Sequence, residues 1–429
     1  MKILIIAPHP DDEIPLAGQL LLNNPQNTYY VVYITNGDAN KKEASTRLKE
    51  ALVVTKKLGI ASNNVFFLGY ADSWQNGHIY NAPLKSLKTG CSGNIETYGL
   101  PEKPEYCFQK SKTHHPYTKE NLLQDLTSLI FEIKAEAILT CAFDEHPDHI
   151  ATSLFVETIL GNILKSTDYR PLFFKKFAYK GVWDGKRDFF SFPPKPTVIT
   201  ESKLEDYLTR EKALHLPVTS NSISYNLKKN EFFKITNLYR SQLSFFYFLS
   251  VANSDYVFWN IRTDNLLYKA HLESSTEGIE YLTDFIKNDF SSVIKHTLDY
   301  TKQWKGTELT IKFEKTTIIS QIILYSFDTI KGDFIFDNGI SVLFDTRKGN
   351  TITFPSIQVK ECKLKAEAAI SITELEMFES QQSPVNCFKT GITEVPKKAN
   401  WFYRVTLKIF FFIKFGILNM IKSVKNYFN

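Results

Sequence analysis

The stretch MKILIIAPHPDDE, Met1 to Glu13, decides the fold of the first part of this 429-residue chain. Its apolar run, Ile3 to Ala7, is too short for the hydrophobic region of a signal peptide and is soon followed by charged residues. A short run of this kind is typical of a strand buried in a parallel sheet. We therefore predict a first strand over Lys2–Ala7, with the HPDDE motif, His9–Glu13, directly after its end.

Short β-branched runs alternate with helical stretches up to about residue 180, a pattern typical of βαβ units and of a Rossmann-like, mainly parallel sheet. The further strands predicted are Tyr29–Thr35, Val65–Leu68 and Ala137–Cys141, with a covering helix over Asn40–Leu58. A weaker pattern follows, with a strand within Phe173–Lys180 and helices over Lys203–Leu214 and Glu231–Val251. We assign residues 1–264 to this α/β domain.

One long segment, Tyr70–Lys119, interrupts the alternation with Gly, Pro, Asn and Ser. Its length exceeds that of an ordinary connection between a strand and a helix, which favours a functional loop or lid over a linker. We expect this insertion to govern access of a ligand.

The sequence changes character after residue 264, where short alternating strands such as ELTIKF and ITELEMF are separated by turn residues. This pattern predicts a separate β-sandwich over residues 265–380. The stretch resembles galactose-binding-like, discoidin-type jelly rolls in Lys269–Gly278, in Trp304 before a strand and in Ile370–Phe378. The resemblance implies contact with carbohydrate, while packing or oligomerisation stays an alternative role for such a module.

Composition excludes some classes of function. The formal net charge of +5 is small for the length, and no finger spacing or dense basic block occurs in the body of the chain, so we expect no nucleic-acid partner. The five cysteines are odd in number, scattered and without CxxC spacing, which favours a reducing, cytoplasmic compartment.

The last segment, 381–429, reads as a linker followed by an amphipathic helix over Trp401–Asn429. Lys408, Lys414 and Lys422 interrupt its apolar run and argue against a transmembrane span. The segment suits a helix that lies on an anionic membrane surface, and docking on protein is the alternative. We therefore expect a cytoplasmic protein that is peripheral on the inner face of a membrane.

Two motifs carry the chemistry: HPDDE after the first strand and HPDH, His146–His149, after the strand that ends at Cys141. Open α/β sheets place their ligand sites at the carboxyl ends of parallel strands, so the two motifs can meet. Together His9, Asp12 and His149 offer two imidazoles and one carboxylate, the ligand set of a catalytic zinc site with an open position. Zn²⁺ is the expected cofactor, and another divalent metal stays open.

Three neighbouring residues are candidates for catalysis. Asp11 precedes the proposed ligand Asp12 and points elsewhere, so it is the expected general base and acid. His146 is the expected stabiliser of the oxyanion, with Asp148 or Asp144 setting its tautomer. The alternative is structural, since these carboxylates can also cap the helices that follow the motifs.

At these motifs the chain resembles the PIG-L/LmbE-like de-N-acetylases over residues 1 to about 180. The resemblance implies zinc ligands at His9, Asp12 and His149, a base at Asp11 and an oxyanion-stabilising His146. The TNGD run at Thr35–Asp38, the Arg47 and Glu50 pair and the LGYADS run at Leu68–Ser73 follow in the family's order.

Further roles follow from the same resemblance. Arg47 and Asp72 are expected to contact sugar hydroxyls or a phosphate. As an alternative, Arg47 and Glu50, three residues apart on a helix, form a surface ion pair.

The resemblance implies hydrolysis of the N-acetyl group of an N-acetylhexosamine in a glycoconjugate or lipid-linked glycan precursor. The sugar, the group attached to it and the oligomeric state stay open. One rival is a metal-dependent phosphoesterase, which would recruit further ligands such as His78, His114 and His115 from the insertion. The other is a non-catalytic glycan-binding protein, in which the β-sandwich binds the sugar.

Overall fold

A computed structural model describes most of the chain. It covers residues 1–39, 44–72, 79–144, 146–178, 183–184, 198–199, 204–209, 212–216, 231–242, 256–292, 297–298, 301–381, 405–406, 409 and 413. The predicted tail helix over Trp401–Asn429 falls almost wholly outside this part and stays a prediction. Within the described residues, no helix is both long enough and apolar enough to cross a membrane.

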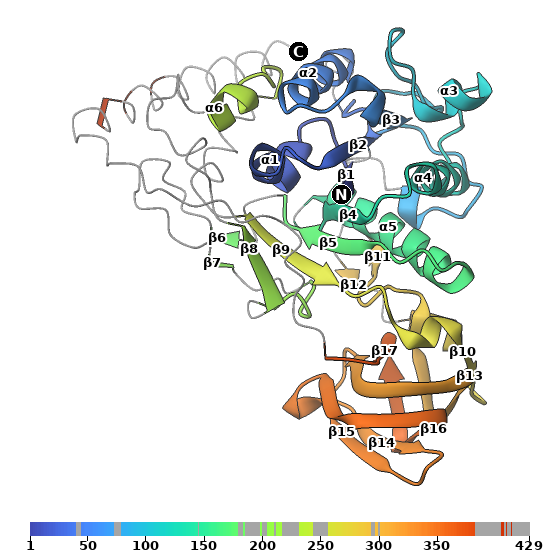
Figure 1. Ribbon diagram of the computed structural model, residues 1–429. Coiled ribbons are helices and arrows are strands. Elements are labelled where there is room, and N and C mark those ends of the chain that lie inside the picture. Colours follow the sequence, from blue (N-terminus) through green and yellow to red (C-terminus); the bar gives the residue numbers. More distant parts are fainter. Residues whose placement is uncertain are drawn as a thin grey trace.

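The N-terminal part is built on a seven-stranded sheet in the order β3-β2-β1-β4-β5-β9-β8 (Figure 1). The strands are β1 (Lys2–Ala7), β2 (Thr28–Thr35), β3 (Val65–Tyr70), β4 (Ala137–Cys141), β5 (Leu172–Lys176), β8 (Ala213–Leu216) and β9 (Tyr256–Ile261). The first five are parallel to one another, and β9 and β8 extend the sheet in antiparallel fashion. The predicted mainly parallel sheet is confirmed.

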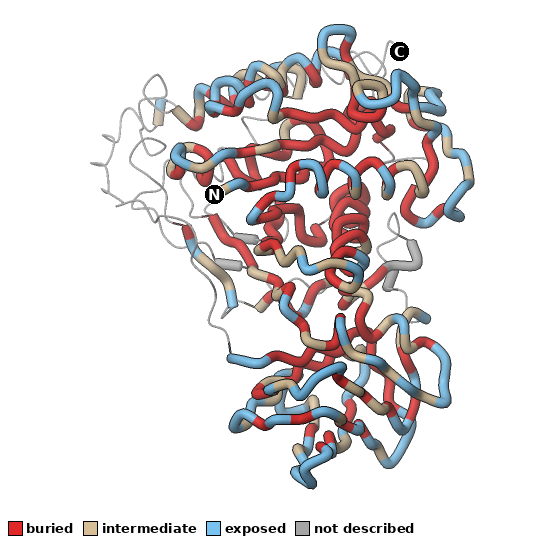
Figure 2. Tube along the Cα trace, turned by 45° about the vertical axis from the view of Figure 1, so that its right-hand side comes forward, coloured by how far each residue is buried: buried red, intermediate tan, exposed pale blue. Residues whose placement is uncertain are grey.

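Helices cover both faces of this sheet (Figure 1). On one face lie α1 (Glu13–Asn23), α2 (Ala44–Lys57) and α6 (Glu231–Thr236), and on the other lie α4 (Lys119–Ile133) and α5 (Pro147–Ser166). Helix α5 begins with a proline at its first position, where the missing N–H is no loss, and His146 is its N-cap. Figure 2 shows α5 buried along nearly its whole length, since both the sheet and the C-terminal part pack on it.

Two predicted helices are wrong in whole or in part. Residues 204–209 are turns and bends, and Ala213–Leu216 is strand β8, paired with β9. The helix predicted over Glu231–Val251 ends at Thr236 as α6, and residues 243–251 lie outside the described part. Pairing along the open edge of β9 satisfies the backbone of β8, and this tertiary gain overrides the local helical spacing.

The insertion packs against the carboxyl end of β3 and carries the short helix α3 (Tyr106–Ser111). The Tyr98 N–H donates to the Gly69 carbonyl at 3.3 Å. Gly69 has φ +84°, and a Cβ there would lie 2.6 Å from the Tyr98 carbonyl oxygen. The close approach of these two segments, β3 and the insertion, therefore requires glycine at this position.

The C-terminal part is a six-stranded antiparallel sheet folded over an apolar core that includes the fully buried Trp304 (Figure 1). Its strands are β10 (Ala270–Glu273), β13 (Trp304–Tyr325), β14 (Lys331–Phe336), β15 (Ser341–Asp345), β16 (Thr351–Ile372) and β17 (Glu374–Phe378). The long strands β13 and β16 shift register where they bend. This architecture agrees with the predicted β-sandwich.

The predicted division at residue 264 falls between Ile261, which ends β9, and Leu266, which begins the 3-10 helix η5 (Leu266–Lys269).

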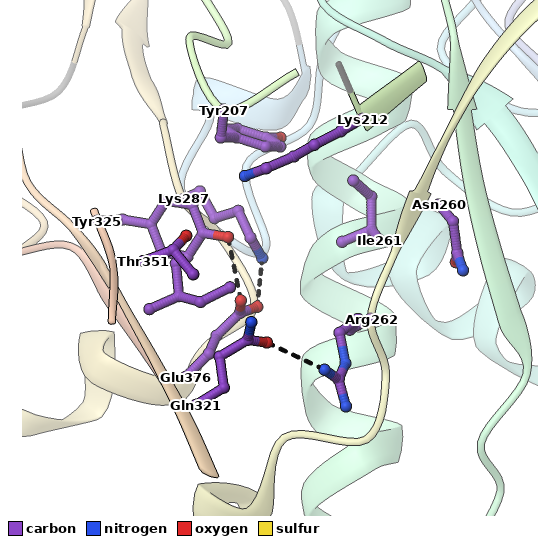
Figure 3. Close-up of a pocket in the computed structure, with 11 residues that line it drawn as sticks. Tyr207, Lys212, Asn260, Ile261, Arg262, Lys287, Gln321, Tyr325, Thr351 and Glu376 are labelled. Atoms are coloured by element: carbon purple, nitrogen blue, oxygen red, sulfur yellow. Dashed lines mark hydrogen bonds and ion pairs between the residues drawn. The ribbon is translucent and has the colours of Figure 1, made fainter. Parts of the chain in front are cut away.

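The two parts meet along a seam that is joined by polar and aromatic contacts (Figure 3). The Arg262 guanidinium, at the end of β9, donates to Gln321 Oε1 at 3.2 Å and to the Ser380 carbonyl at 2.8 Å. The rings of Tyr207 and Tyr325 meet edge to face, 5.7 Å apart. Two cavities of about 170 and 310 Å³ lie along this seam, and neither is lined by a residue of HPDDE or HPDH.

Candidate active site

The two motifs meet at the carboxyl ends of β1 and β4, as the positions of the strands in the sheet require. Asp12 lies between two imidazoles: its Oδ2 is 2.9 Å from His9 Nδ1 and 3.2 Å from His149 Nε2. All three side chains are buried. The residues expected to bind the metal are thus brought together by the fold.

The two contacts of Asp12 have the separations expected of ligands that share one zinc ion. With bonds of 2.0 to 2.1 Å in a tetrahedral site, two ligand atoms lie about 3.3 Å apart. The contacts of 2.9 and 3.2 Å at Asp12 have this spacing. Although Asp12 is the N-cap residue of α1, its side chain makes no capping bond, and the capping alternative does not account for it.

Other carboxylates orient the two imidazoles. Asp144 Oδ2 is 2.8 Å from His149 Nδ1, and Asp148 Oδ2 is 3.1 Å from His9 Nε2. Each histidine thereby has one nitrogen facing Asp12 and the other facing a carboxylate, the usual arrangement for metal-ligating histidines. Two other groups have ligand atoms that all lie within 4.8 Å of one another: His9, His146 and His149, and His9, Asp72 and Asp148. We favour the set containing Asp12, because its carboxylate contacts both imidazoles and completes the two-histidine, one-carboxylate ligand set of a catalytic zinc site.

At Nδ1 of His146 the structure places a backbone N–H in place of the expected carboxylate. The backbone N–H of Asp148 donates to His146 Nδ1 at 3.1 Å, while the carboxylates of Asp144 and Asp148 contact the rings of His149 and His9. Nδ1 is therefore an acceptor, and the proton of the neutral ring is on Nε2. Burial and the neighbouring His149 and His9 hold the pKa of His146 well below its usual value. His146 is accordingly a neutral N–H donor rather than a cation.

Asp11 is the one residue of HPDDE that is only partly buried. Its φ of 130° is rare for a residue with a side chain, and such backbone strain is characteristic of functional positions. Burial raises the pKa of Asp11 to about 6, although the nearby Arg47 opposes the rise. A carboxyl group with this pKa can both accept and release a proton near neutral pH.

Glu13, to which the sequence analysis gives no role, holds the backbone of Asp11 in place. Glu13 Oε2 accepts from the Asp11 N–H at 3.1 Å, and Glu13 Oε1 accepts from the Tyr239 hydroxyl at 2.5 Å. Burial raises the pKa of Glu13 to about 8. Tyr239 reaches this position from beyond α6, so its distance in sequence concealed the contact. In the sequence, only the position of Glu13 as the last residue of the HPDDE motif indicated that it belongs to the site.

The two predicted substrate contacts lie at the site but are held by protein groups. Arg47 donates to Asp11 Oδ1 at 3.2 Å and to the carbonyls of Gly37 and Pro10, each at 3.1 Å. Asp72 Oδ2 is 3.7 Å from His9 Nε2. Contact of either side chain with substrate stays a prediction.

The alternative ion pair of Arg47 is not formed. The carboxylate of Glu50 accepts instead from the N–H and the hydroxyl of Ser241, at 3.0 and 2.6 Å. Arg47 therefore belongs to the site, where it neutralises Asp11, and Glu50 fastens the segment after α6 to α2.

Similar proteins were found by sequence family and by structure. Residues 4–160 match the family described as PIG-L: GlcNAc-PI de-N-acetylase. No curated protein matches the chain. Several solved structures resemble parts of it, and three of them are described. A deacetylase of teicoplanin biosynthesis in complex with teicoplanin has 14% identity and a TM-score of 0.36, covering 62% of this chain and all of that one. The N,N'-diacetylchitobiose deacetylase of Pyrococcus horikoshii has 12% identity and a TM-score of 0.34, covering 61% and 84%.

The third structure resembles the C-terminal part. It is the family 32 carbohydrate-binding module of C. perfringens NanJ in complex with galactose, with 17% identity and a TM-score of 0.20, covering 26% of this chain and 95% of that one. These low scores carry no functional argument, and the family match does not extend to the C-terminal part. Residues 4–160, which contain the whole His and Asp cluster, are similar to the PIG-L family of de-N-acetylases.

Proposed function

We propose that the protein is a zinc-dependent hydrolase that removes the acetyl group from an N-acetylated amino sugar, releasing acetate and a free amine. The observation that carries this proposal is the contact of Asp12 with both His9 and His149, next to the strained and partly exposed Asp11. These residues fall within the match to the PIG-L family.

Each group of the site has a task in the proposed reaction. A cation held by His9, Asp12 and His149 would supply a Lewis acid that polarises the acetyl carbonyl and makes water more acidic. Asp11 accepts a proton from the attacking water as the water oxygen bonds to the acetyl carbon. The same carboxyl group then returns the proton to the sugar nitrogen as the carbon–nitrogen bond breaks, so that acetate and amine leave.

Two further residues support these steps. His146 is neutral, with its proton on Nε2, and donates to the acetyl oxygen as negative charge develops there. The Arg47 guanidinium, 3.2 Å from Asp11 Oδ1, keeps part of the Asp11 population ionised despite its burial. Arg47 thus adjusts the base, whatever else it contacts.

For the substrate we propose an N-acetylglucosamine conjugate on a lipid or glycan carrier. The family match supports the sugar, because its description names GlcNAc-PI. The amphipathic pattern of Trp401–Asn429 supports a lipid carrier and a position on the cytoplasmic face of a membrane. A sugar-binding role for the β-sandwich would add a second contact to the same glycoconjugate.

The experiment that tests the activity measures release of acetate and amine from a panel of N-acetylhexosamine conjugates. Zinc-loaded wild type is compared with Asp11→Asn, which keeps the metal ligands and loses the base. We expect kcat/KM to fall by about 10² to 10⁴ in the variant. Asp168→Asn, at a fully exposed carboxylate, is the matched control and should retain wild-type activity.

Other results would change the proposal. Activity in Asp11→Asn equal to that of wild type would remove Asp11 from the mechanism. Release of phosphate without acetate would favour the phosphoesterase, and sugar binding without turnover would favour a glycan-binding protein.

Membrane binding is tested separately: removal of residues 401–429 should abolish sedimentation with anionic vesicles, and unchanged sedimentation would end the membrane proposal.

A further inference from the structure

A second group of metal-binding side chains lies in the insertion, away from HPDDE and HPDH. Cys107 is on α3, His115 is in the loop that follows, and Asp125 is on α4. One ligand atom from each residue lies within 4.8 Å of the other two. Three elements that are separate in the fold therefore present a thiol, an imidazole and a carboxylate to one point.

The spacing within this group matches that of ligands sharing one ion. His115 Nδ1 is 3.0 Å from Asp125 Oδ1, close to the 2.9 and 3.2 Å found at Asp12 in the candidate active site. Glu105 borders this group, because its Oε1 lies 3.8 Å from Cys107 Sγ and 2.5 Å from His114 Nδ1. Oxygen and sulfur ligands of one zinc ion are expected about 3.6 Å apart.

Burial gives a second argument. The side chains of Glu105 and Asp125 are only 1% and 5% exposed, yet their ion-pair partners among the described residues are the imidazoles of His114 and His115. A buried carboxylate is costly unless a charge or a metal compensates it. By contrast, the buried Glu157 pairs with the ammonium of Lys175 at 2.7 Å. A divalent cation would balance Glu105 and Asp125 as Lys175 balances Glu157.

We propose that Cys107, His115, Asp125 and Glu105 bind a second zinc ion in a closed, structural site. Four protein ligands leave no open position for substrate, which distinguishes this site from the proposed catalytic one. The ligands span a short stretch of chain, so binding closes the loop between α3 and α4. Zinc suits this mixed set better than Mg²⁺ or Ca²⁺, which prefer oxygen ligands alone.

The site would fasten the insertion next to the proposed active site. The Tyr70 hydroxyl, at the end of β3, donates to Asp125 Oδ2 at 2.9 Å. Elsewhere in the insertion, the Tyr98 hydroxyl donates to Asp38 Oδ2 at 3.0 Å, and Asp38 Oδ1 accepts from the N–H of Asp72 at 2.8 Å. Asp72 borders His9. Zinc in the insertion would therefore stabilise the wall of the site without taking part in the reaction.

The test counts metal in the purified full-length chain and detects thiolate ligation. After loading with zinc and exhaustive dialysis, elemental analysis should find about two equivalents per wild-type chain and about one in Cys107→Ser. Cys91→Ser is the matched control, because this thiol lies outside the group, and should keep both. His149→Ala should also lose about one equivalent, from the other site.

Cobalt substitution provides a readout that does not depend on the folding of a variant. Titration of metal-free wild type with Co²⁺ should develop the ultraviolet charge-transfer absorption of a cobalt thiolate. His149→Ala should keep this absorption, and Cys107→Ser should lose it. A zinc content that Cys107→Ser leaves unchanged, or cobalt binding without thiolate absorption, would overturn the proposal. Neither result depends on whether the chain hydrolyses N-acetyl sugars, so failure of the proposed activity is recognised separately.

Discussion

Two buried clusters of charged side chains lie close together in the α/β part, and they differ in what balances their carboxylates. In the candidate active site, Asp12 contacts the imidazoles of His9 and His149. In the other cluster, the ammonium of Lys175 on β5 pairs with Glu157 on α5 at 2.7 Å and with Glu205. Imidazoles are metal ligands when neutral, whereas an ammonium has no lone pair with which to bind a metal.

The comparison teaches how a buried charge cluster can be assigned. Lys175 pairs with both Glu157 and Glu205, and the Tyr207 hydroxyl adds a bond to Glu205 at 2.7 Å, so we interpret this cluster as structural. It also supports the active site, because Glu205 Oε2 accepts from the Phe143 N–H at 2.5 Å. Phe143 precedes Asp144, which contacts His149. One cluster is arranged for a ligand, and the other holds the loop on which that arrangement depends.

The largest effect expected is on activity, from removal of a proposed metal ligand. His149→Ala should lose the catalytic zinc and lower kcat/KM by about 10⁴-fold or more, equivalent to about 5 kcal/mol of transition-state stabilisation. Deacetylation kinetics and metal analysis measure both losses. The exposed His215→Ala on β8 is the control. Wild-type kinetics in His149→Ala would place the metal elsewhere and remove the distinction between the clusters.

The next effect is on stability, from the structural cluster. Lys175→Met should lower the free energy of unfolding by about 3 to 5 kcal/mol, because it leaves Glu157 and Glu205 buried without their cation. Urea unfolding followed by circular dichroism measures the change. Lys234→Met removes an exposed partner of Glu231 and should cost at most about 1 kcal/mol. Equal losses of unfolding free energy in the two variants would show that the buried Lys175 cluster stabilises the fold no more than an exposed ion pair does.

A smaller effect is expected where a carboxylate only orients a proposed ligand. Asp148→Asn keeps the size of the side chain but weakens its contact with His9 Nε2, so zinc affinity should fall about 10- to 100-fold. Competition with a chelator measures the affinity. Glu280→Gln, on the distant 3-10 helix η6 (Ile279–Thr283), should leave it unchanged. An unaltered affinity in Asp148→Asn would make the contact incidental.

An effect of similar size is a dependence of stability on pH. Burial raises the pKa of Glu157 to about 7, since Lys175 cannot fully compensate both carboxylates. A raised folded-state pKa means that the stabilising contribution is complete below the unfolded-state pKa, near 4.5, and is lost as the pH rises through about 7. Glu157→Gln should reduce this loss by about 2 to 3 kcal/mol between pH 5 and 8. Parallel urea midpoints for wild type and variant across that range would refute the assignment.

The sequence predicted the elements whose signals are local. The strands Lys2–Ala7 and Ala137–Cys141 match β1 and β4 to the residue, and the motifs after them meet as expected. Apolar runs and the ends of strands can be recognised from adjacent residues. The order of strands in the parallel sheet then determines which carboxyl ends lie side by side. The error at Ala213–Leu216 arose where a distant strand, β9, determined the local structure.

The amino-acid sequence alone thus determined the α/β architecture, the β-rich part that follows and the residue types of the proposed metal site. Only the tertiary structure decided that Asp148 contacts His9, that Arg47 contacts Asp11 and that Lys175 is buried between two glutamates. In the sequence, Lys175 is a lysine in a strand, and nothing nearby foretells its burial. Such partners are separated by tens of residues and chosen by side-chain geometry across packed elements, so no short pattern encodes them.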